Sequence, residues 1–401
     1  MKTTAVILTV MVLVAAAWLG GCAKPVPTLQ ADPVKARIDA EVALNTALYA
    51  EAATTRARAI EALSQLEGAS AGRMYVQALA DPEPVVRFAA AIAIGDATYE
   101  PARARLVEMA GRDVRKGEND RRVYAGVLYA LWRLGDASVA PDLVRLLKDP
   151  EWAVQDSVVL ALGKMTVNTR EIMNLMRIQV VYERQPEVKM RLVESMAMLG
   201  DLRSRDLLGA YTQTREYPGQ DLQAIHALGK VGQLYPESAG RVARVLSVLT
   251  VPGCEAHLRL AAVAALADMG VVDDGAYDYT MAAMTDTARV ISEGRKDANV
   301  TPEEIDAVRY MAALALGRMN RPVAVDAVLP MLQSESGLLR VAGALSILRL
   351  LPPPPVAPIL FNTDATNGPA GAVQSEPGAS ANEASPAKAP RTTLNTADAK
   401  D

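Results

Sequence analysis

Apolar and polar residues recur in one pattern from about residue 54 to residue 351. Asp81–Gly95 reads DPEPVVRFAAAIAIG, and Asp149–Gly163 reads DPEWAVQDSVVLALG. In both segments apolar residues return at three- and four-residue spacing, which is typical of a helix with one buried face. We expect the Asp-Pro pair to cap the start of each helix and the glycine to stop it in a left-handed conformation.

Weaker copies of this helix alternate with a second kind of helix. QPEVKMRLVESMAMLG is a weaker copy, while PARARLVEMA and APDLVRLLKD lie between copies. The closing glycines are Gly95, Gly135, Gly163, Gly200, Gly229, Gly270 and Gly317. A single helix pair cannot bury its apolar stripe, whereas stacked pairs can. The pattern therefore predicts an all-α fold, an α-solenoid of stacked antiparallel helix pairs.

This pattern resembles the HEAT-like repeats of the phycobilisome-lyase type, in which a short helix is followed by Asp-Pro and by a helix with Val-Arg and Ala-Leu-Gly. The resemblance covers roughly residues 54–351 and implies a HEAT-like solenoid. The sequence departs from it at the arginine position, which holds Gln155 in one repeat and Asp221 in another. Some relatives attach a chromophore, but no residues here match a tetrapyrrole site, so that activity is not expected.

The N-terminus has the three parts of a bacterial secretion signal. Lys2 supplies a positive charge, residues 5–19 form an apolar run, and Leu-Gly-Gly-Cys ends the segment at Cys22. The run is shorter than the roughly 20 residues that a membrane-spanning helix needs. Leu-Gly-Gly-Cys resembles the lipobox of bacterial lipoproteins, which implies cleavage before Cys22 and lipidation of its thiol. The alternatives are an ordinary signal peptide with an accidental cysteine, and an uncleaved anchor.

The lipobox resemblance also implies a location. Lipoproteins of this type carry more than one acyl chain, which gives stable membrane anchoring. In that family an Asp after the cysteine favours retention at the inner membrane, whereas this chain has Ala23. We therefore expect the protein in the cell envelope, at the outer membrane facing the periplasm if the organism has one.

Four segments are expected along the chain: a signal peptide at 1–21, a lipidated cysteine and tether at 22–32, a HEAT-like α-solenoid at 33–351, and a tail at 352–401. Asp32-Pro33 predicts a helix start, although residues 33–67 are compatible with one helix or two. Four prolines begin at Pro352, and the remainder is rich in Ala, Pro, Ser, Thr and Asn, which is typical of disorder.

Net charge, cysteine content and the placement of the histidines limit the functions that the chain can have. The chain of 401 residues has a formal net charge of −4, so it offers no basic field for nucleic acid. Its two cysteines, Cys22 and Cys254, exclude a disulfide framework. His226 and His257 lack the convergent partners of a catalytic or metal site, although Cys254 could share a helical face with His257. We expect no enzyme activity, no metal, no cofactor and no small-molecule substrate.

An arginine recurs in the repeats and is the one polar feature that does so. The positions are Arg87, Arg122, Arg191, Arg259, Arg309 and Arg340. These arginines either line a concave face for an acidic partner or form an internal ladder with loop carboxylates of neighbouring repeats, and the negative net charge favours the ladder.

The function predicted from these observations is that of a membrane-anchored, non-catalytic scaffold that binds unknown protein partners through its repeats. The alternatives are an accessory or regulatory subunit of an envelope enzyme or assembly complex, and a structural envelope component in contact with the cell wall.

Overall fold

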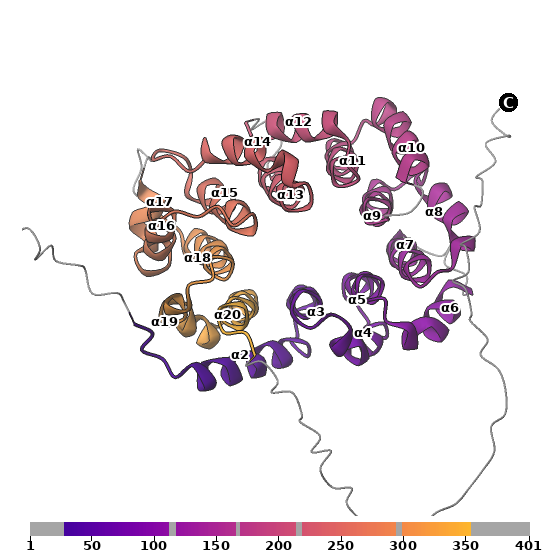
Figure 1. Ribbon diagram of the computed structural model, residues 1–401. Helices are drawn as coiled ribbons and strands as arrows, with labels where there is room; N and C mark the ends of the chain where they lie inside the picture. The colour runs from indigo at the N-terminus through magenta and orange to yellow at the C-terminus, as the bar shows by residue number, and fades with distance from the viewer. Residues whose placement is uncertain (1–27, 112–117, 166–168, 214–218, 294–298, 354–401) are drawn as a thin grey trace, which may run out of the picture. The chain divides into compact units, whose positions relative to one another are not determined.

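The computed structural model describes residues 28–111, 118–165, 169–213, 219–293 and 299–353. Within these ranges the regular elements are helices without any strand, and they stack as an all-α solenoid of HEAT-like repeats (Figure 1). None of the helices in this part of the chain is long and apolar enough to cross a membrane. The predictions for the signal peptide, for Cys22 and for the tail beyond residue 353 lie outside the described residues.

The helices form an inner and an outer set (Figure 1). The inner helices are α3 (Ala53–Leu66), α5 (Pro84–Ala97), α7 (Glu118–Arg133), α9 (Trp152–Gly163), α11 (Pro186–Met198), α13 (Gln220–Leu234), α15 (Ala256–Asp268), α18 (Pro302–Leu316) and α20 (Gly337–Leu350). The outer helices are α2 (Pro33–Ala47), α4 (Gly72–Ala78), α6 (Arg103–Gly111), α8 (Ala140–Leu146), α10 (Thr169–Tyr182), α12 (Leu202–Tyr211), α14 (Pro236–Ser247), α16 (Asp274–Thr285), α17 (Thr287–Ser292) and α19 (Val325–Val328). Short 3-10 helices adjoin the outer set: η1 (Gly68–Ala71), η2 (Glu100–Ala102), η4 (Ala137–Val139), η5 (Pro322–Ala324) and η6 (Leu329–Gln333).

The start of α2 follows the sequence prediction, and residues 33–67 contain two helices. The Asp32 carboxylate accepts from the backbone N–H groups of Val34 and Lys35, and proline occupies the first position of the helix. Asp81 and Asp149 were expected to cap helices in the same way, but α5 and α9 begin three residues after them. Each of these carboxylates instead accepts from the N–H group two residues on, at 2.8 and 3.0 Å, and so closes the turn before the helix.

The repeated glycines have two different roles. The expected left-handed conformation occurs at Gly135, Gly200 and Gly270. The expectation is wrong for Gly95, Gly163, Gly229 and Gly317, none of which has a positive φ. A Cβ atom at Gly317 would lie 2.8 Å from the Cα atom of Ser346, and one at Gly229 would lie 2.9 Å from the Cα atom of Ala265. These glycines therefore allow consecutive inner helices to touch, which any side chain would prevent.

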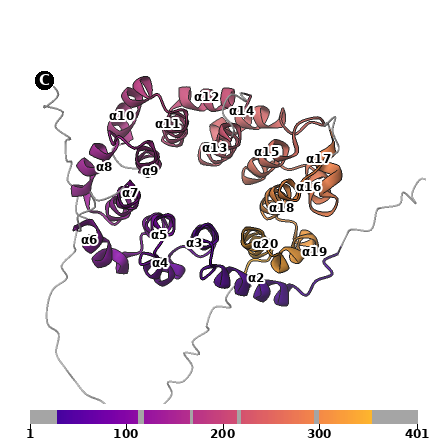
Figure 2. The same ribbon diagram turned by 180° about the vertical axis from the view of Figure 1, so that it is seen from behind.

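The first and last helices of the array pack against each other, which the sequence did not predict. The outer helix α2 lies on α20, and the inner helix α3 packs beside α20 (Figures 1 and 2). Ala36, Ala40 and Leu44 of α2 are buried in a cluster that continues into α20. Arg37 adds a hydrogen bond of 2.6 Å to the carbonyl oxygen of Leu351. Helices α2 to α20 therefore form a closed circuit, which we call the ring.

Candidate functional site

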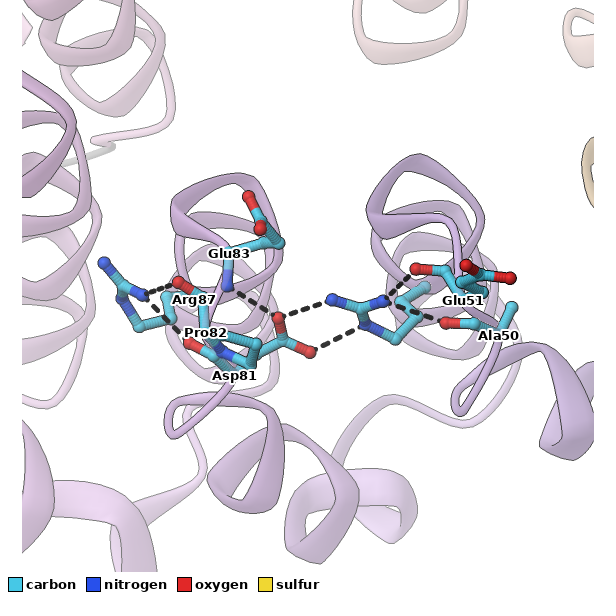
Figure 3. A network of polar contacts seen from close by, with 7 residues as sticks. Ala50, Glu51, Asp81, Pro82, Glu83 and Arg87 are labelled. Atoms are coloured by element: carbon cyan, nitrogen blue, oxygen red, sulfur yellow. Dashed lines mark hydrogen bonds and ion pairs between the residues drawn. The ribbon is translucent and has the colours of Figure 1, made fainter.

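Three arginines on inner helices bind the loop that precedes their own helix: Arg56, Arg87 and Arg340. In each case Nη1 donates to the carbonyl oxygens of the residues five and six positions earlier, at 2.6–2.9 Å, as Figure 3 shows for Arg87. Gln155 makes one of these two bonds, because its Nε2 lies 2.7 Å from the carbonyl oxygen of Asp149. Sequence reasoning missed Arg56 because residues 33–67 were predicted only as one helix or two and were not compared with the arginine position of the repeats.

Asp81 joins two neighbouring repeats (Figure 3). Its carboxylate accepts from Nε and Nη2 of Arg56, both at 2.8 Å, and from the backbone N–H of Glu83 at 2.8 Å. Burial by itself would raise the pKa of this carboxyl, but the hydrogen bonds from Arg56 and Glu83 outweigh burial and hold the pKa below its ordinary value. The carbonyl oxygen of Asp81 accepts from Arg87, so the residue binds arginines of both α3 and α5.

A second contact of this kind uses Arg121 rather than the expected Arg122. Nε and Nη2 of Arg121 donate to the carboxylate of Asp149 at 2.8 and 3.1 Å. Nε of Arg122 lies 3.4 Å from the hydroxyl of Ser157 on α9. At both Asp81 and Asp149, a loop carboxylate is thus held by an arginine of the preceding inner helix, which fixes the spacing between repeats.

The other arginines singled out from the sequence have partners of several kinds. Nε of Arg191 donates to Asp156 of α9 at 2.9 Å. The guanidinium of Arg259 stacks on Tyr279, with 3.5 Å between its carbon and the ring centre. Nε of Arg309 lies 3.3 Å from a threonine hydroxyl on α17. The six predicted positions lie on six different inner helices, and the structure does not bring them together.

A different group of charged side chains does converge. Arg318 follows α18, while Arg349, Asp268 and Lys230 lie in the last turns of α20, α15 and α13. Nε of Arg318 lies 2.9 Å from Oδ1 of Asp268, and Arg349 donates to the amide oxygen of Gln65 on α3. We call Arg318, Arg349, Lys230 and Asp268 the basic cluster, since three of its four members are positively charged.

The charges of the cluster act on the pKa values of its members. Burial, together with the positive charge of Arg318, lowers the pKa of Arg349 to about 10. Burial raises the pKa of Asp268, although Arg318, Arg349 and Lys230 each act to lower it. Lys230, Asp268, Arg318 and Arg349 lie near the C-terminal ends of α13, α15, α18 and α20, which are all inner helices (Figure 1). The basic cluster therefore lies at the C-terminal ends of the inner helices.

The two histidines lie in different surroundings. His226 reaches solvent beside the basic cluster, yet desolvation there, followed by the charges of Arg318 and Lys230, lowers its pKa to about 4. It is neutral at pH 7 and leaves the charge of the cluster unchanged. The spacing of Cys254 and His257 allowed a shared helical face, but Cys254 precedes α15 and lies outside the helix that holds His257. In the described ranges, no three His, Cys, Asp or Glu side chains come together as metal ligands would.

The basic cluster has the composition of an anion-binding site. Among the described residues, no hydrogen-bond acceptor meets the buried Nη1 of Arg349. Guanidinium groups bind carboxylates and phosphates through two parallel N–H bonds, and neighbouring positive charges strengthen that binding. Sequence reasoning missed the cluster because a basic residue in the last turn of a helix is ordinarily explained by the helix dipole, as at Arg349.

Comparison with known proteins agrees with this fold. Residues 308–334 match the family described as the PBS lyase HEAT-like repeat, which confirms the predicted repeat type. No curated protein matches the chain in sequence. Human deoxyhypusine hydroxylase in complex with glycerol is 19% identical, over 80% of this chain and 99% of that chain, with a TM-score of 0.34. The complex of CpcE and CpcF of phycocyanin lyase from Nostoc is 20% identical, over 65% and 95%, with a TM-score of 0.37.

These similar structures correct one expectation. Both are named after enzymes, a hydroxylase and a lyase, and they overturn the sequence-based prediction that this chain has no enzyme activity. We withdraw that prediction. The identities and TM-scores are too low to transfer either activity, so hydroxylation and lyase chemistry remain properties of those proteins. The fold and the family match together establish a helical protein built of HEAT-like repeats.

Proposed function

We propose that this protein is a lipid-anchored protein of the bacterial cell envelope that binds an acidic segment of a partner protein at the C-terminal ends of its inner helices. The observation that carries the proposal is the basic cluster, in which Arg318, Arg349 and Lys230 oppose the single carboxylate of Asp268. The whole chain has a net charge of −4, so this concentration of positive charge is a local feature.

A carboxylate side chain of the partner suits the cluster. The side chains of Arg318 and Asp268 are 17% and 30% exposed, and Lys230 is exposed, so a ligand reaches the cluster without unfolding the repeats. Because Arg349 is largely buried, a charge-assisted hydrogen bond from its guanidinium to a carboxylate of the partner is stronger than one in water. Removing one member of such a partly buried ion pair typically costs about 2–5 kcal/mol of binding free energy.

The N-terminal motif supports the anchor. Leu-Gly-Gly-Cys at Cys22 resembles a lipobox, and Ala23 favours the outer membrane in the family that it resembles. A lipid at Cys22 would hold the ring within reach of other envelope proteins, which raises their effective concentration. HEAT-like repeats suit such a role because stacked helix pairs present a long continuous surface to a protein ligand.

Palmitate labelling in cells tests the anchor. The unaltered chain is expected to take up the label and to begin at Cys22 by mass spectrometry. Cys22→Ala is expected to lose the label and to retain residues 1–21, since the cysteine is both the acyl acceptor and the residue after the cleavage site. A labelled and cleaved Cys22→Ala chain would contradict the proposed anchor.

Photo-cross-linking in cells tests the binding site. A photoreactive amino acid at Gln233, which is exposed one turn after Lys230, is expected to capture a protein through an acidic segment. Arg318→Gln combined with Arg349→Gln should abolish the cross-link, because it removes two of the three positive charges. The matched control replaces Arg241 and Arg289, whose side chains are 70% and 54% exposed in surface ion pairs, and should retain it. Equal cross-linking in both double variants contradicts the proposed site.

A further inference from the structure

The outer side of α2 presents a row of apolar side chains to the surroundings. Val34, Ile38 and Val42 are spaced by four residues and are 67%, 52% and 59% exposed. The buried residues of the same helix, among them Ala36 and Ala40, face α20 from the opposite side. The two rows lie on opposite sides of the helix, because residues two positions apart are separated by about half a turn. Packing of Ala36 and Ala40 on α20 therefore directs Val34, Ile38 and Val42 outward. We call Val34, Ile38 and Val42 the α2 stripe.

The chain is fastened to the ring directly before α2. The Asp326 carboxylate accepts from the backbone N–H groups of Gln30 and Ala31, at 2.8 Å each. Arg37 is bonded to the carbonyl oxygen of Leu351, so α2 is held by polar contacts as well as by its buried face. Only residues 23–29 separate Cys22 from this attachment, and seven residues span at most about 25 Å when fully extended.

We infer that the α2 stripe lies on the surface of the bilayer, with its apolar side chains among the lipid headgroups and the upper acyl chains. The inference rests on the lipid at Cys22 that the proposed function includes. A short tether brings the start of α2 to the membrane, where exposed apolar side chains next to a lipid anchor lose contact with water by entering the interface. The ring is then held in one orientation by two attachments, the lipid and the stripe.

A lipid surface fits the α2 stripe better than a second copy of the chain does. Stable protein interfaces bury about 1,200–2,000 Å² in total, far more than three side chains of one helix supply. A bilayer needs no complementary shape and accepts single apolar side chains next to an anchor. Another exposed apolar group, formed by Ile178, Val181 and Tyr182, belongs to α10, which lies across the ring from α2 (Figure 1).

Depth-dependent fluorescence quenching tests the inference. The full acylated chain, carrying Cys254→Ser, is bound to phosphatidylcholine vesicles and labelled with a fluorophore at Ile38→Cys or, as the matched control, at Ile178→Cys. Lipids brominated near the headgroup are expected to quench residue 38 by about twofold or more and to leave residue 178 unquenched, because only the first site reaches the interface. Val34→Ser combined with Val42→Ser should remove the quenching at residue 38 without releasing the protein from the vesicles.

The outcomes separate this inference from the proposed anchor. A chain without acyl groups that does not float with vesicles contradicts the anchor itself. A vesicle-bound, acylated chain whose residue 38 is unquenched overturns the inference alone, and so does equal quenching at residues 38 and 178, which indicates free tumbling on the tether. Protection of residue 38 by a second copy, seen as unquenched fluorescence together with a dimeric mass, also overturns it.

Discussion

Replacing Leu44 with alanine is expected to open the ring at the contact between α2 and α20 while leaving the other repeats folded. Leu44 is 2% exposed and lies on the face of α2 that packs on α20. Removing such a buried side chain costs about 2–5 kcal/mol, the lost transfer free energy plus that of the cavity. In repeat arrays, stability is approximately a sum over repeats and their nearest-neighbour interfaces, so the loss falls on the interface that contains the substitution.

Hydrogen exchange followed by mass spectrometry measures where the loss falls. A loss of about 2 kcal/mol corresponds to roughly 30-fold faster exchange, which we expect in α2 and in the part of α20 that it covers. In the Leu44→Ala variant, exchange in α7 and α9 should stay unchanged. Leu143→Ala is the matched control, because Leu143 is 0% exposed on the outer helix α8 and distant along the chain from the closure. Its effect should fall on α8 and on the helices that pack against it, α7 and α9.

Uniformly faster exchange in all helices of the Leu44→Ala variant would refute this reasoning, since it would show that the ring unfolds as one cooperative unit. Unchanged exchange in α2 would refute the closure itself. A smaller effect confined to α2 and α20 would support the closure and indicate that the cavity partly collapses.

Three further predictions concern single positions. Asp81→Asn should lower the free energy of unfolding at pH 7 by about 1–3 kcal/mol. Because the folded pKa of Asp81 is depressed, this difference should disappear in urea titrations as the pH falls through that pKa, and a constant difference would argue against it. The folded pKa of His226, about 4, lies below its ordinary value, so the neutral form is favoured and stability should fall as the pH drops from about 6.5 towards 4. Since His226 reaches solvent, the effect should stay below about 1 kcal/mol, and His226→Gln should remove it. Gly317→Val should cost about 1–3 kcal/mol in thermal unfolding, because its Cβ would meet the backbone of Ser346, while Gly240→Ala in open space should cost nothing.

The local rules of the fold could be predicted from the sequence because they act over a few residues. The cap at Asp32 and the alternation of two kinds of helix depend on neighbours along the chain. The glycines show the limit of this approach. Gly200 and Gly317 end similar sequence patterns, yet one is left-handed and the other is a contact point for the next inner helix. The second role depends on packing between repeats, which the spacing within one repeat does not reveal.

The ring and its basic cluster depend on contacts between segments far apart in the chain. The apolar face of α2 has the same pattern as other repeat helices, so the sequence does not reveal that α20 covers it. Arg121 and Arg122 are adjacent, and only the rotation of α7 decides which of them reaches Asp149. Arg318 and Asp268 meet because α15 and α18, which are separated along the chain by α16 and α17, pack side by side as consecutive inner helices.

The closure of the ring restricts how this protein can change in evolution. An open solenoid gains or loses repeats at its ends or in its middle, and each end needs a unit with a polar outer face. Here α2 and α20 cover each other, so no terminal unit is required. The rotations between successive helix pairs must then add up to one full turn, which ties the number of pairs to the rotation from one pair to the next. Duplication of a single repeat would leave a gap or an overlap at α2, whereas loops between helices remain free to lengthen.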